Sequence, residues 1–239
     1  LPIFLSFGDP RPYASRIAAA GAMLVCQVQS IAQLPQAIEA GAAIVVAQGG
    51  EAGGHGAAAM TARSTMPFVP EAADWLAVNA PDVLLLGAGG IADGRGLASV
   101  LMLGADGVLV GSRLWASREG LAPLGAKQEA LAADGDATAR SPIVDVLRRK
   151  EWPAEYDFRA LRNALHRTWE GREADLRVNP VTARAEFDAG VAAGDYACAN
   201  VTVGESVGLI RDLPTAGEIV KRMAQEAQAC LAGASGLIA

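Results

Sequence analysis

Short apolar runs alternate with amphipathic segments along the first 110 residues of the chain. The runs lie at residues 3–7, 23–28, 44–47, 83–86 and 107–110. Such runs are typical of strands buried on both faces of a parallel sheet, and apolar residues three or four apart are typical of covering helices. Helices are predicted around residues 13–21, 30–41, 70–79 and 93–103. Because parallel neighbours need crossover connections, the pattern predicts five βα units of one α/β sheet.

Two capping boxes mark helix starts. Ser30 is followed three residues later by Gln33, and Thr215 is followed by Glu218 at the same spacing. In a capping box the two side chains satisfy backbone N–H groups of the first helical turn. The second box predicts a final helix that runs to Leu231.

A glycine-rich segment follows the third strand. Five of the eight residues from Gly49 to Gly56 are glycines, and His55 lies among them. Glycines after a strand let backbone approach a ligand closely, and an imidazole exchanges a proton near neutral pH. His55, one of two histidines in the chain, is therefore a candidate acid or base. A hydrogen-bonded loop histidine without a chemical role is the alternative.

Two further glycine-containing loops follow the fourth and fifth strands. The first spans residues 87–96, and the second begins with Gly111 and Ser112. Backbone N–H groups in such loops, with the dipole of the next helix, hold anions, and two consecutive loops of this kind are typical of the TIM-barrel phosphate site. Glycines that only allow tight turns are the alternative. The glycines after the third strand do not form a G-x-G-x-x-G that opens a helix, and no Gly-Lys-Ser/Thr occurs, which disfavours Rossmann and P-loop folds.

The segment over residues 121–196 has few β-branched runs. Leu161, Leu165 and Trp169 recur every four residues, which predicts a helix with one apolar face. We expect a helical cap here, with His166 partly exposed and structural because it lies one residue off that face. The charged residues Asp157, Arg159 and Arg162 are interpreted as a solvated face, with contact to an anionic substrate as the alternative.

Composition limits the classes of partner and compartment. The formal net charge is -6, and 51% of the residues are hydrophobic. This acidic balance argues against nucleic acid as a partner, and no run of apolar residues is long enough for a membrane span. Cys26, Cys198 and Cys230 lie far apart without metal-ligand spacing, so neither a disulfide framework nor a metal site is predicted. A cytoplasmic protein, with homo-oligomerisation as an open possibility, is expected.

Four stretches together resemble a known family. They span residues 48–56, 88–96, 103–113 and 204–212. Their sequences look like those of the nitronate monooxygenases, formerly called 2-nitropropane dioxygenases. The resemblance implies a TIM (β/α)8 barrel that binds FMN without a covalent bond, with a smaller helical domain over the mouth of the active site. It assigns residues 1–120 to the barrel, 121–200 to the helical cap and substrate domain, and 201–239 to a return to the barrel with the final helix.

The resemblance also implies roles for single residues. His55 would be the catalytic histidine. The FMN phosphate would lie against Gly89, Gly90, Gly111 and Ser112. The remaining cofactor contacts would come from Gln27, which would face the flavin, and from Ala52, Gly53 and Gly54 of the third loop.

The chain departs from the family pattern at its start. The first residues, from Leu1, already resemble a strand, and no initiator Met precedes them. The family's first strands, which carry a ring-facing Asn, have no counterpart here. Five strands cannot close an eight-stranded barrel, so we expect the five to be strands 4–8 and the earlier ones to be missing from this sequence.

The resemblance implies oxidation of alkyl nitronates, such as propionate 3-nitronate, by O2 to carbonyl compounds and nitrite or nitrate, without NAD(P)H. One alternative is an FMN-dependent enoyl-acyl-carrier-protein reductase that takes hydride from NAD(P)H. Others are a barrel isomerase or lyase for a phosphorylated substrate, and a phosphate-binding or flavin-binding protein without turnover.

Overall fold

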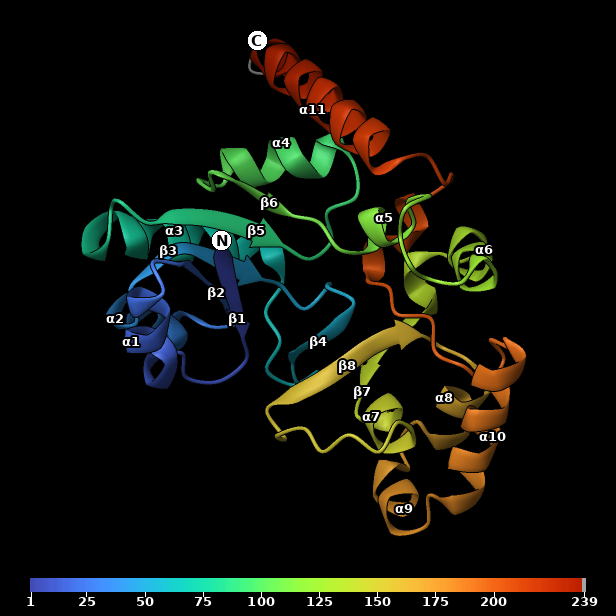
Figure 1. Ribbon diagram of the computed structural model, residues 1–239. Helices are drawn as coiled ribbons and strands as arrows, with labels where there is room; N and C mark the ends of the chain where they lie inside the picture. Colours follow the sequence, from blue (N-terminus) through green and yellow to red (C-terminus); the bar gives the residue numbers. More distant parts are fainter. Residues whose placement is uncertain (238–239) are drawn as a thin grey trace. The chain divides into compact units, whose positions relative to one another are not determined.

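The computed structural model describes residues 1–237 and divides into two compact units (Figure 1). The first unit consists of residues 1–50 and 63–110 together with the chain from Lys221 onward. The second unit consists of residues 51–62 and 111–220. The glycine-rich segment that follows the third predicted strand is therefore shared between the two units.

The first unit is built on a five-stranded parallel sheet in the order β1-β2-β3-β5-β6. Its central strand β3 carries Val45, Val46 and Ala47, which are fully buried, as expected for a strand covered on both faces. The five predicted strands are thus confirmed, with small shifts at their ends. Their bounds are β1 Pro2–Ser6, β2 Met23–Val28, β3 Ala42–Gln48, β5 Leu84–Ala88 and β6 Gly107–Leu109.

The α/β class and the parallel βα order are confirmed. β1 and β6 are the two edge strands of the sheet, and the described residues do not close it into a barrel. Ile3 and Phe4 on β1 are 39% and 44% exposed, so this edge presents apolar side chains as well as unpaired backbone groups.

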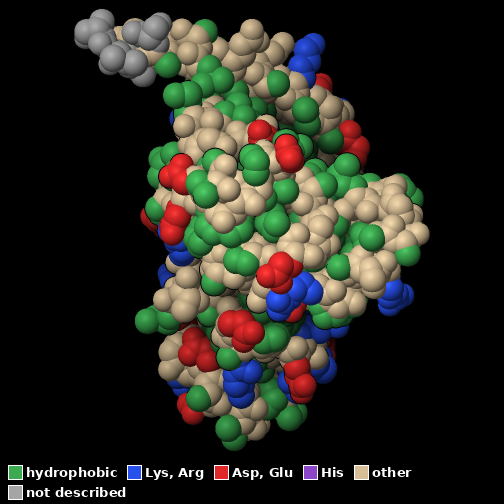
Figure 2. Space-filling model, turned by 90° about the vertical axis from the view of Figure 1, so that its left-hand side faces the viewer, with side chains coloured by type: hydrophobic (Ala, Val, Ile, Leu, Met, Phe, Trp, Pro, Cys, Tyr) green, Lys and Arg blue, Asp and Glu red, His purple; other side chains and the backbone are tan. Residues whose placement is uncertain are grey.

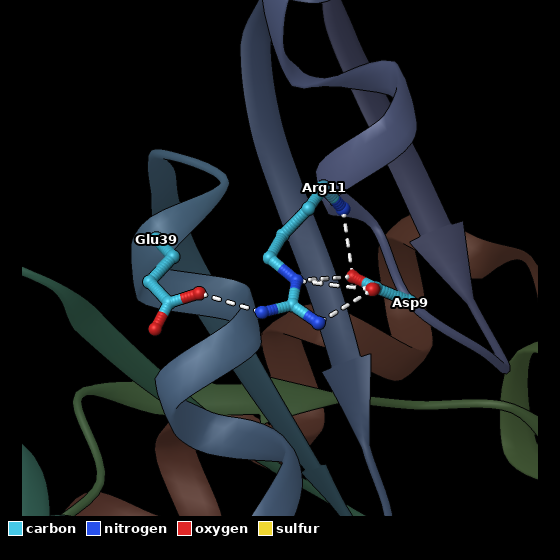
Figure 3. Close-up of polar contacts among 3 residues, drawn as sticks. All are labelled: Asp9, Arg11 and Glu39. Carbon is cyan, nitrogen blue, oxygen red and sulfur yellow. Dashed lines mark hydrogen bonds and ion pairs between the residues drawn. The ribbon is translucent and has the colours of Figure 1, made fainter.

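Helices follow the strands of the first unit in chain order. They are α1 Arg11–Ala19, the 3-10 turn η1 Ile31–Gln33, α2 Leu34–Glu39, α3 Thr65–Asn79 and α4 Gly94–Met102. The capping box of Ser30 and Gln33 is present at the start of η1. The helices α1 and α2 are tied to each other by Arg11, which donates to Asp9 and to Glu39 at the end of α2 (Figure 3).

The helix α3 begins earlier than the sequence pattern predicts. Pro70 was expected in its first turn, but it lies inside the helix, which starts at Thr65. The Thr65 hydroxyl donates to the carbonyls of Ala88 and Gly89, and Phe68 and Val69 are fully buried. These tertiary contacts hold the first turn in place and override the preference of proline for a helix start.

The final helix α11 spans Ala216–Gly233 and continues as the 3-10 turn η4 Ala234–Leu237. Its capping box is confirmed, because the Glu218 carboxylate accepts from the Thr215 N–H and the Thr215 hydroxyl accepts from the Glu218 N–H. The helix begins in the second unit and continues in the first.

The second unit contains an antiparallel sheet in the order β4-β8-β7, which the sequence pattern did not predict. Its strands are β4 Gly54–Ala57, β7 Thr138–Ser141 and β8 Tyr156–Leu161. Leu161 therefore ends a strand and does not belong to a helix with Leu165 and Trp169. The expectation that helices alone form this segment needs this correction, because alternate residues of β8 are buried with the period of two that a strand has.

Helices complete the second unit, and α7 to α10 lie together beside its sheet (Figure 1). A core formed mainly by Ile143, Leu147, Leu165, Leu176 and Phe187 joins these helices. Their bounds are α7 Ile143–Leu147, α8 Ala164–Trp169, α9 Glu173–Val178 and α10 Val181–Ala193. The other helical elements of this unit are α5 Ser112–Trp115, α6 Leu124–Ala132, η2 Gly135–Ala137 and η3 Glu205–Leu209.

Acidic and basic side chains are interspersed on the face of the molecule drawn in Figure 2. Among the described residues, no helix has both the length and the apolar character that crossing a bilayer requires.

Candidate active site

His55 lies on strand β4, not in a loop as the glycine-rich sequence suggested. It pairs with Phe158 across the antiparallel β4–β8 ladder. Glycines weaken strand propensity, which is why the pattern gave no strand signal here. Pairing with β8 supplies the order that the local sequence lacks.

The Nε2 atom of His55 contacts a buried carboxylate. It lies 3.0 Å from Oδ1 and 2.9 Å from Oδ2 of Asp145, on helix α7. The two side chains are 12% and 5% exposed. A carboxylate only accepts hydrogen bonds, so Nε2 carries the hydrogen and the lone pair of a neutral ring lies on Nδ1.

Aromatic side chains pack around the same imidazole. Trp152 stacks on it with ring centroids 3.5 Å apart and planes 19° apart. The ring of Phe158 packs edge to face with the imidazole, with the two ring centroids 4.8 Å apart. The Arg148 guanidinium lies over the Phe158 ring, 5.3 Å from its centroid. The ring of His55 is therefore held by stacking as well as by the carboxylate.

A buried arginine holds the backbone that precedes His55 and the neighbouring strand β8. Arg140, on β7, donates to the carbonyls of Ala52 at 2.6 Å and of Asp157 at 2.7 Å, and more weakly to that of Gly54 at 3.4 Å. Burial, and then repulsion from Arg159, lowers the pKa of Arg140 to about 10. This pKa leaves the guanidinium charged at neutral pH, so it keeps all of its donors.

Two predicted cofactor residues of the second unit, Gly53 and Ser112, lie beside Gly204. The Gly204 N–H donates to the Ser112 hydroxyl at 2.8 Å. A Cβ on Gly53 would lie 2.5 Å from the backbone of Val203, and a Cβ on Gly204 would meet the carbonyl of Glu51. The absence of side chains at both glycines lets two backbone segments touch, and this contact explains why glycines are needed there.

The remaining predicted residues of the second unit are distributed around these contacts. Ala52 precedes β4, and its carbonyl accepts from Arg140. Gly54 is the first residue of β4. Gly111 precedes α5, and a Cβ placed on it would meet no atom within 4 Å, so open space adjoins this position.

The first unit carries the predicted residues Gln27, Gly89 and Gly90. Gln27 lies on β2 and lines a cavity of about 210 Å³ with Ser6 and Gly8. Gly89 and Gly90 directly follow β5 with φ angles of 99° and 75°, which glycine adopts without strain. Gly111 follows β6, which is the sheet neighbour of β5, so the two glycine loops follow adjacent strands.

The first N–H groups of helix α4, which the sequence pattern suggested for anion binding, already donate to carboxylates of the chain. The Gly94 N–H donates to Glu226 at 2.9 Å, and the Gly96 N–H donates to Asp93 at 3.1 Å. Carboxylates of the chain itself therefore occupy these donors, and an anion beside this loop would depend on the glycines that precede the helix.

A pair of buried amides near the end of β2 was not predicted. The Gln29 Nε2 donates to the Gln48 Oε1 at 3.2 Å. The Oε1 of Gln29 is buried, and among the described residues it has no hydrogen-bond partner. A buried carbonyl oxygen of this kind is normally satisfied by a ligand or by water.

The second histidine does not face solvent. His166 is only 2% exposed, which corrects the expectation of partial exposure. The helix α8 begins after Asn163, whose Oδ1 accepts from the His166 N–H. The prediction counted Leu161 as part of this helix and therefore placed its apolar face wrongly. Burial lowers the pKa of His166 to about 4.

The structure thus places Ala52, Gly53, Gly54, His55, Gly111 and Ser112 within the second unit. It places Gln27, Gly89 and Gly90 within the first. Sequence reasoning missed the residues that surround His55, which are Asp145, Trp152, Phe158 and Arg140. Asp145 is 90 residues away from His55 in the chain, and no spacing rule connects such positions.

Comparison with known proteins identifies the family. Residues 3–226 match the family described as nitronate monooxygenase. A curated nitronate monooxygenase of Neurospora crassa is 32% identical over 226 residues, which cover 92% of this chain and 58% of that protein. The chain therefore spans little more than half the length of this relative.

Two solved structures are similar over almost the whole chain. FabK from Thermotoga maritima has a TM-score of 0.81 at 26% identity, covering 99% of this chain and 71% of its own. The nitroalkane oxidase from Streptomyces ansochromogenes has a TM-score of 0.77 at 26% identity, covering 98% and 66%. With the family match over residues 3–226, these findings show that the chain belongs to the nitronate monooxygenase family of flavin-dependent oxidoreductases.

Proposed function

We propose that this chain forms the catalytic part of an FMN-dependent enzyme that oxidises alkyl nitronates, such as propionate 3-nitronate, with O2. Carbonyl compounds and nitrite or nitrate are the expected products. The observation that carries the proposal is the position of His55, which a buried carboxylate and a stacked indole hold within the motif that the family match covers.

Features of each unit support the proposal of a bound flavin. Gly89 and Gly90 have positive φ angles, which are common in loops that bind anions through backbone N–H groups, and open space adjoins Gly111. These glycines and Ser112 would hold the phosphate of FMN. The buried Gln29 Oε1, which has no hydrogen-bond partner among the described residues, offers an acceptor. Gln27, Ala52, Gly53 and Gly54 would supply the remaining contacts.

Bound FMN would take electrons from the nitronate and pass them to O2. His55 would act on the substrate in one of two ways. Towards a neutral nitro compound the neutral imidazole would accept a proton from carbon at Nδ1. Towards an anionic nitronate the protonated ring would donate a hydrogen bond from Nδ1, because the Nε2 hydrogen faces Asp145. Trp152 and Phe158 would keep water away from the ring faces that they cover.

Anaerobic mixing tests the proposal. The purified full-length protein is mixed with propionate 3-nitronate, and separately with NADPH and NADH, while the visible absorption of the flavin is followed. We expect the nitronate to bleach the flavin, and neither nicotinamide to do so. Bleaching by a nicotinamide alone, or the absence of a flavin band, would contradict the proposal.

The second candidate is an FMN-dependent enoyl-acyl-carrier-protein reductase. The structural similarity to FabK favours this candidate, because its TM-score of 0.81 slightly exceeds the TM-score of 0.77 for the nitroalkane oxidase. The same experiment separates the two, because a reductase needs rapid reduction of its flavin by NADH or NADPH. A phosphate-binding protein without flavin turnover would give neither signal.

A further inference from the structure

We infer that Asp145 is a positioning residue for His55, which it holds in one ring orientation with the hydrogen on Nε2. The catalytic part of this inference rests on the proposed function. Its structural part, the fixed tautomer, does not.

The contact is specific to one nitrogen of the ring. Both carboxylate oxygens of Asp145 lie within hydrogen-bond distance of Nε2, at 3.0 and 2.9 Å. If the ring turned over, the carboxylate would face a C–H group and lose this bond. The contact therefore selects the orientation of the ring as well as the position of its hydrogen.

The carboxylate is carried by a rigid element. Asp145 lies in the first turn of α7, and it is 4% exposed. Its helix neighbours Ile143, Val144 and Leu147 are almost completely buried in the core of the second unit. A side chain on such an element loses little freedom when it binds its partner, so it can fix a second side chain.

Other groups around His55 hold the backbone and the ring faces. Trp152 and Phe158 pack against the imidazole, and Arg140 holds the carbonyls of Ala52 and Gly54. The Asp157 carboxylate, on the neighbouring strand, instead accepts from the Ala59 N–H at 3.0 Å. The Asp145 carboxylate contacts a ring nitrogen directly, 2.9 Å from Nε2, so it can select the tautomer.

Nitrogen NMR tests the structural part directly. The chain has two histidines, and the variants His55→Gln and His166→Gln assign their ring signals in the full-length protein labelled with ¹⁵N-histidine. At alkaline pH, where imidazoles are neutral, we expect the Nε2–H pattern for His55. His166 serves as the internal reference, because its Nδ1 lies 3.2 Å from the Asn163 Oδ1, and it should show the Nδ1–H pattern.

The decisive variant is Asp145→Ala, with Asp157→Ala as the matched control. An amide at position 145 could still accept from Nε2 through its oxygen, whereas alanine removes the acceptor altogether. We therefore expect both tautomers of His55 to be populated in Asp145→Ala in place of the single Nε2–H pattern. The signals of His166 should stay unchanged in both variants. Asp157→Ala should leave the His55 pattern as it is, because the Asp157 carboxylate contacts the Ala59 N–H and not the imidazole. Thermal unfolding of both variants checks that they remain folded.

Steady-state kinetics with propionate 3-nitronate tests the catalytic part. We expect Asp145→Ala to lower kcat by about 10²-fold with a much smaller change in KM, since misplacing a reacting group has this order of effect. Asp145→Glu, which keeps a carboxylate, should recover part of the loss. Asp157→Ala should retain the wild-type kcat.

The outcomes distinguish this inference from the proposed function. A single, unchanged tautomer in folded Asp145→Ala would overturn the inference. A changed tautomer with a wild-type kcat would overturn the positioning role in catalysis. If the wild-type protein does not oxidise nitronates but its tautomer depends on Asp145, the proposed function fails while the structural part of the inference stands.

Discussion

The surroundings of the two histidines differ in almost every respect. His55 lies on a strand rich in glycine, where a carboxylate contacts its Nε2 and an indole stacks on its ring. His166 lies on a helix inside the core of the second unit, where its Nε2 is buried and, among the described residues, has no hydrogen-bond partner. The first environment provides for proton exchange, and the second keeps the imidazole neutral. Chemistry should therefore depend on one histidine and stability on the other.

The largest expected effect comes from His55→Gln. The glutamine amide can still donate to Asp145, but it cannot exchange a proton, so we expect turnover of a nitronate to fall about 10²- to 10⁴-fold. His166→Gln is the matched control, and it should keep its turnover while it loses stability. Turnover and urea unfolding of both variants give the comparison. Similar turnover in the two variants would remove the distinction.

The next effect is a loss of stability in mild acid. The pKa of His166 is about 4 in the folded chain, compared with 6.5 in the unfolded chain. Between these values the unfolded chain binds a proton that the folded chain does not, so stability is fully present above pH 6.5 and is lost as the pH falls towards 4. The shift corresponds to about 3 kcal/mol.

Urea unfolding of wild type and His166→Gln at several pH values between 7 and 4.5 measures this effect. The carboxylates are the same in both proteins, so the difference between the two curves reports His166. We expect the wild type to lose its advantage as the pH falls. If the free energies of unfolding of the two proteins change with pH in parallel, His166 does not titrate between pH 7 and 4.5.

A smaller effect is expected at Asn163, which holds the start of the helix that carries His166. Its side chain accepts from the His166 N–H and donates to the carbonyls of Cys198 and Ala199. Asn163→Ala should lower the free energy of unfolding by roughly 1–3 kcal/mol without changing turnover. Asn179→Ala, at an exposed position, is the control. A loss of turnover in folded Asn163→Ala would connect the two histidine regions and contradict their separation.

The smallest effect is expected from Trp152→Phe. The smaller ring keeps an aromatic face against His55 but loses contact area, which should cost about 0.5–1.5 kcal/mol. Turnover should change only a few-fold. Trp75→Phe, on α3, gives the reference for a tryptophan outside the unit that carries His55. Wild-type stability in Trp152→Phe would show that the stack contributes nothing measurable.

The sequence predicted the first unit much better than the second. Runs such as Ile44–Val46 are strong local signals, and the side-chain chemistry of Ser30 and Thr215 marks helix starts without help from distant residues. The strand β4 consists of Gly54, His55, Gly56 and Ala57, and only its pairing with β8 makes it a strand. Non-local pairing of this kind has no local signature.

The same difference applies to the site. The glycine-rich motif indicated His55 as a candidate. Nothing in the pattern indicated Asp145 or Arg140, because both lie far along the chain and only tertiary packing brings them to His55. The prediction that His166 is partly exposed was wrong because it counted Leu161 as part of the helix. The cofactor contacts of Gln27, Ala52, Gly53, Gly54, Gly89, Gly90, Gly111 and Ser112 stay predictions.

The pairing of β4 with β8 also determines when the surroundings of His55 assemble during synthesis. The partner carboxylate of His55 emerges 90 residues after it, which corresponds to about 5–20 s at typical elongation rates. During that interval β4 has neither its neighbouring strand nor the guanidinium that holds its carbonyls. His55 therefore reaches its native surroundings only after β8 has been synthesised.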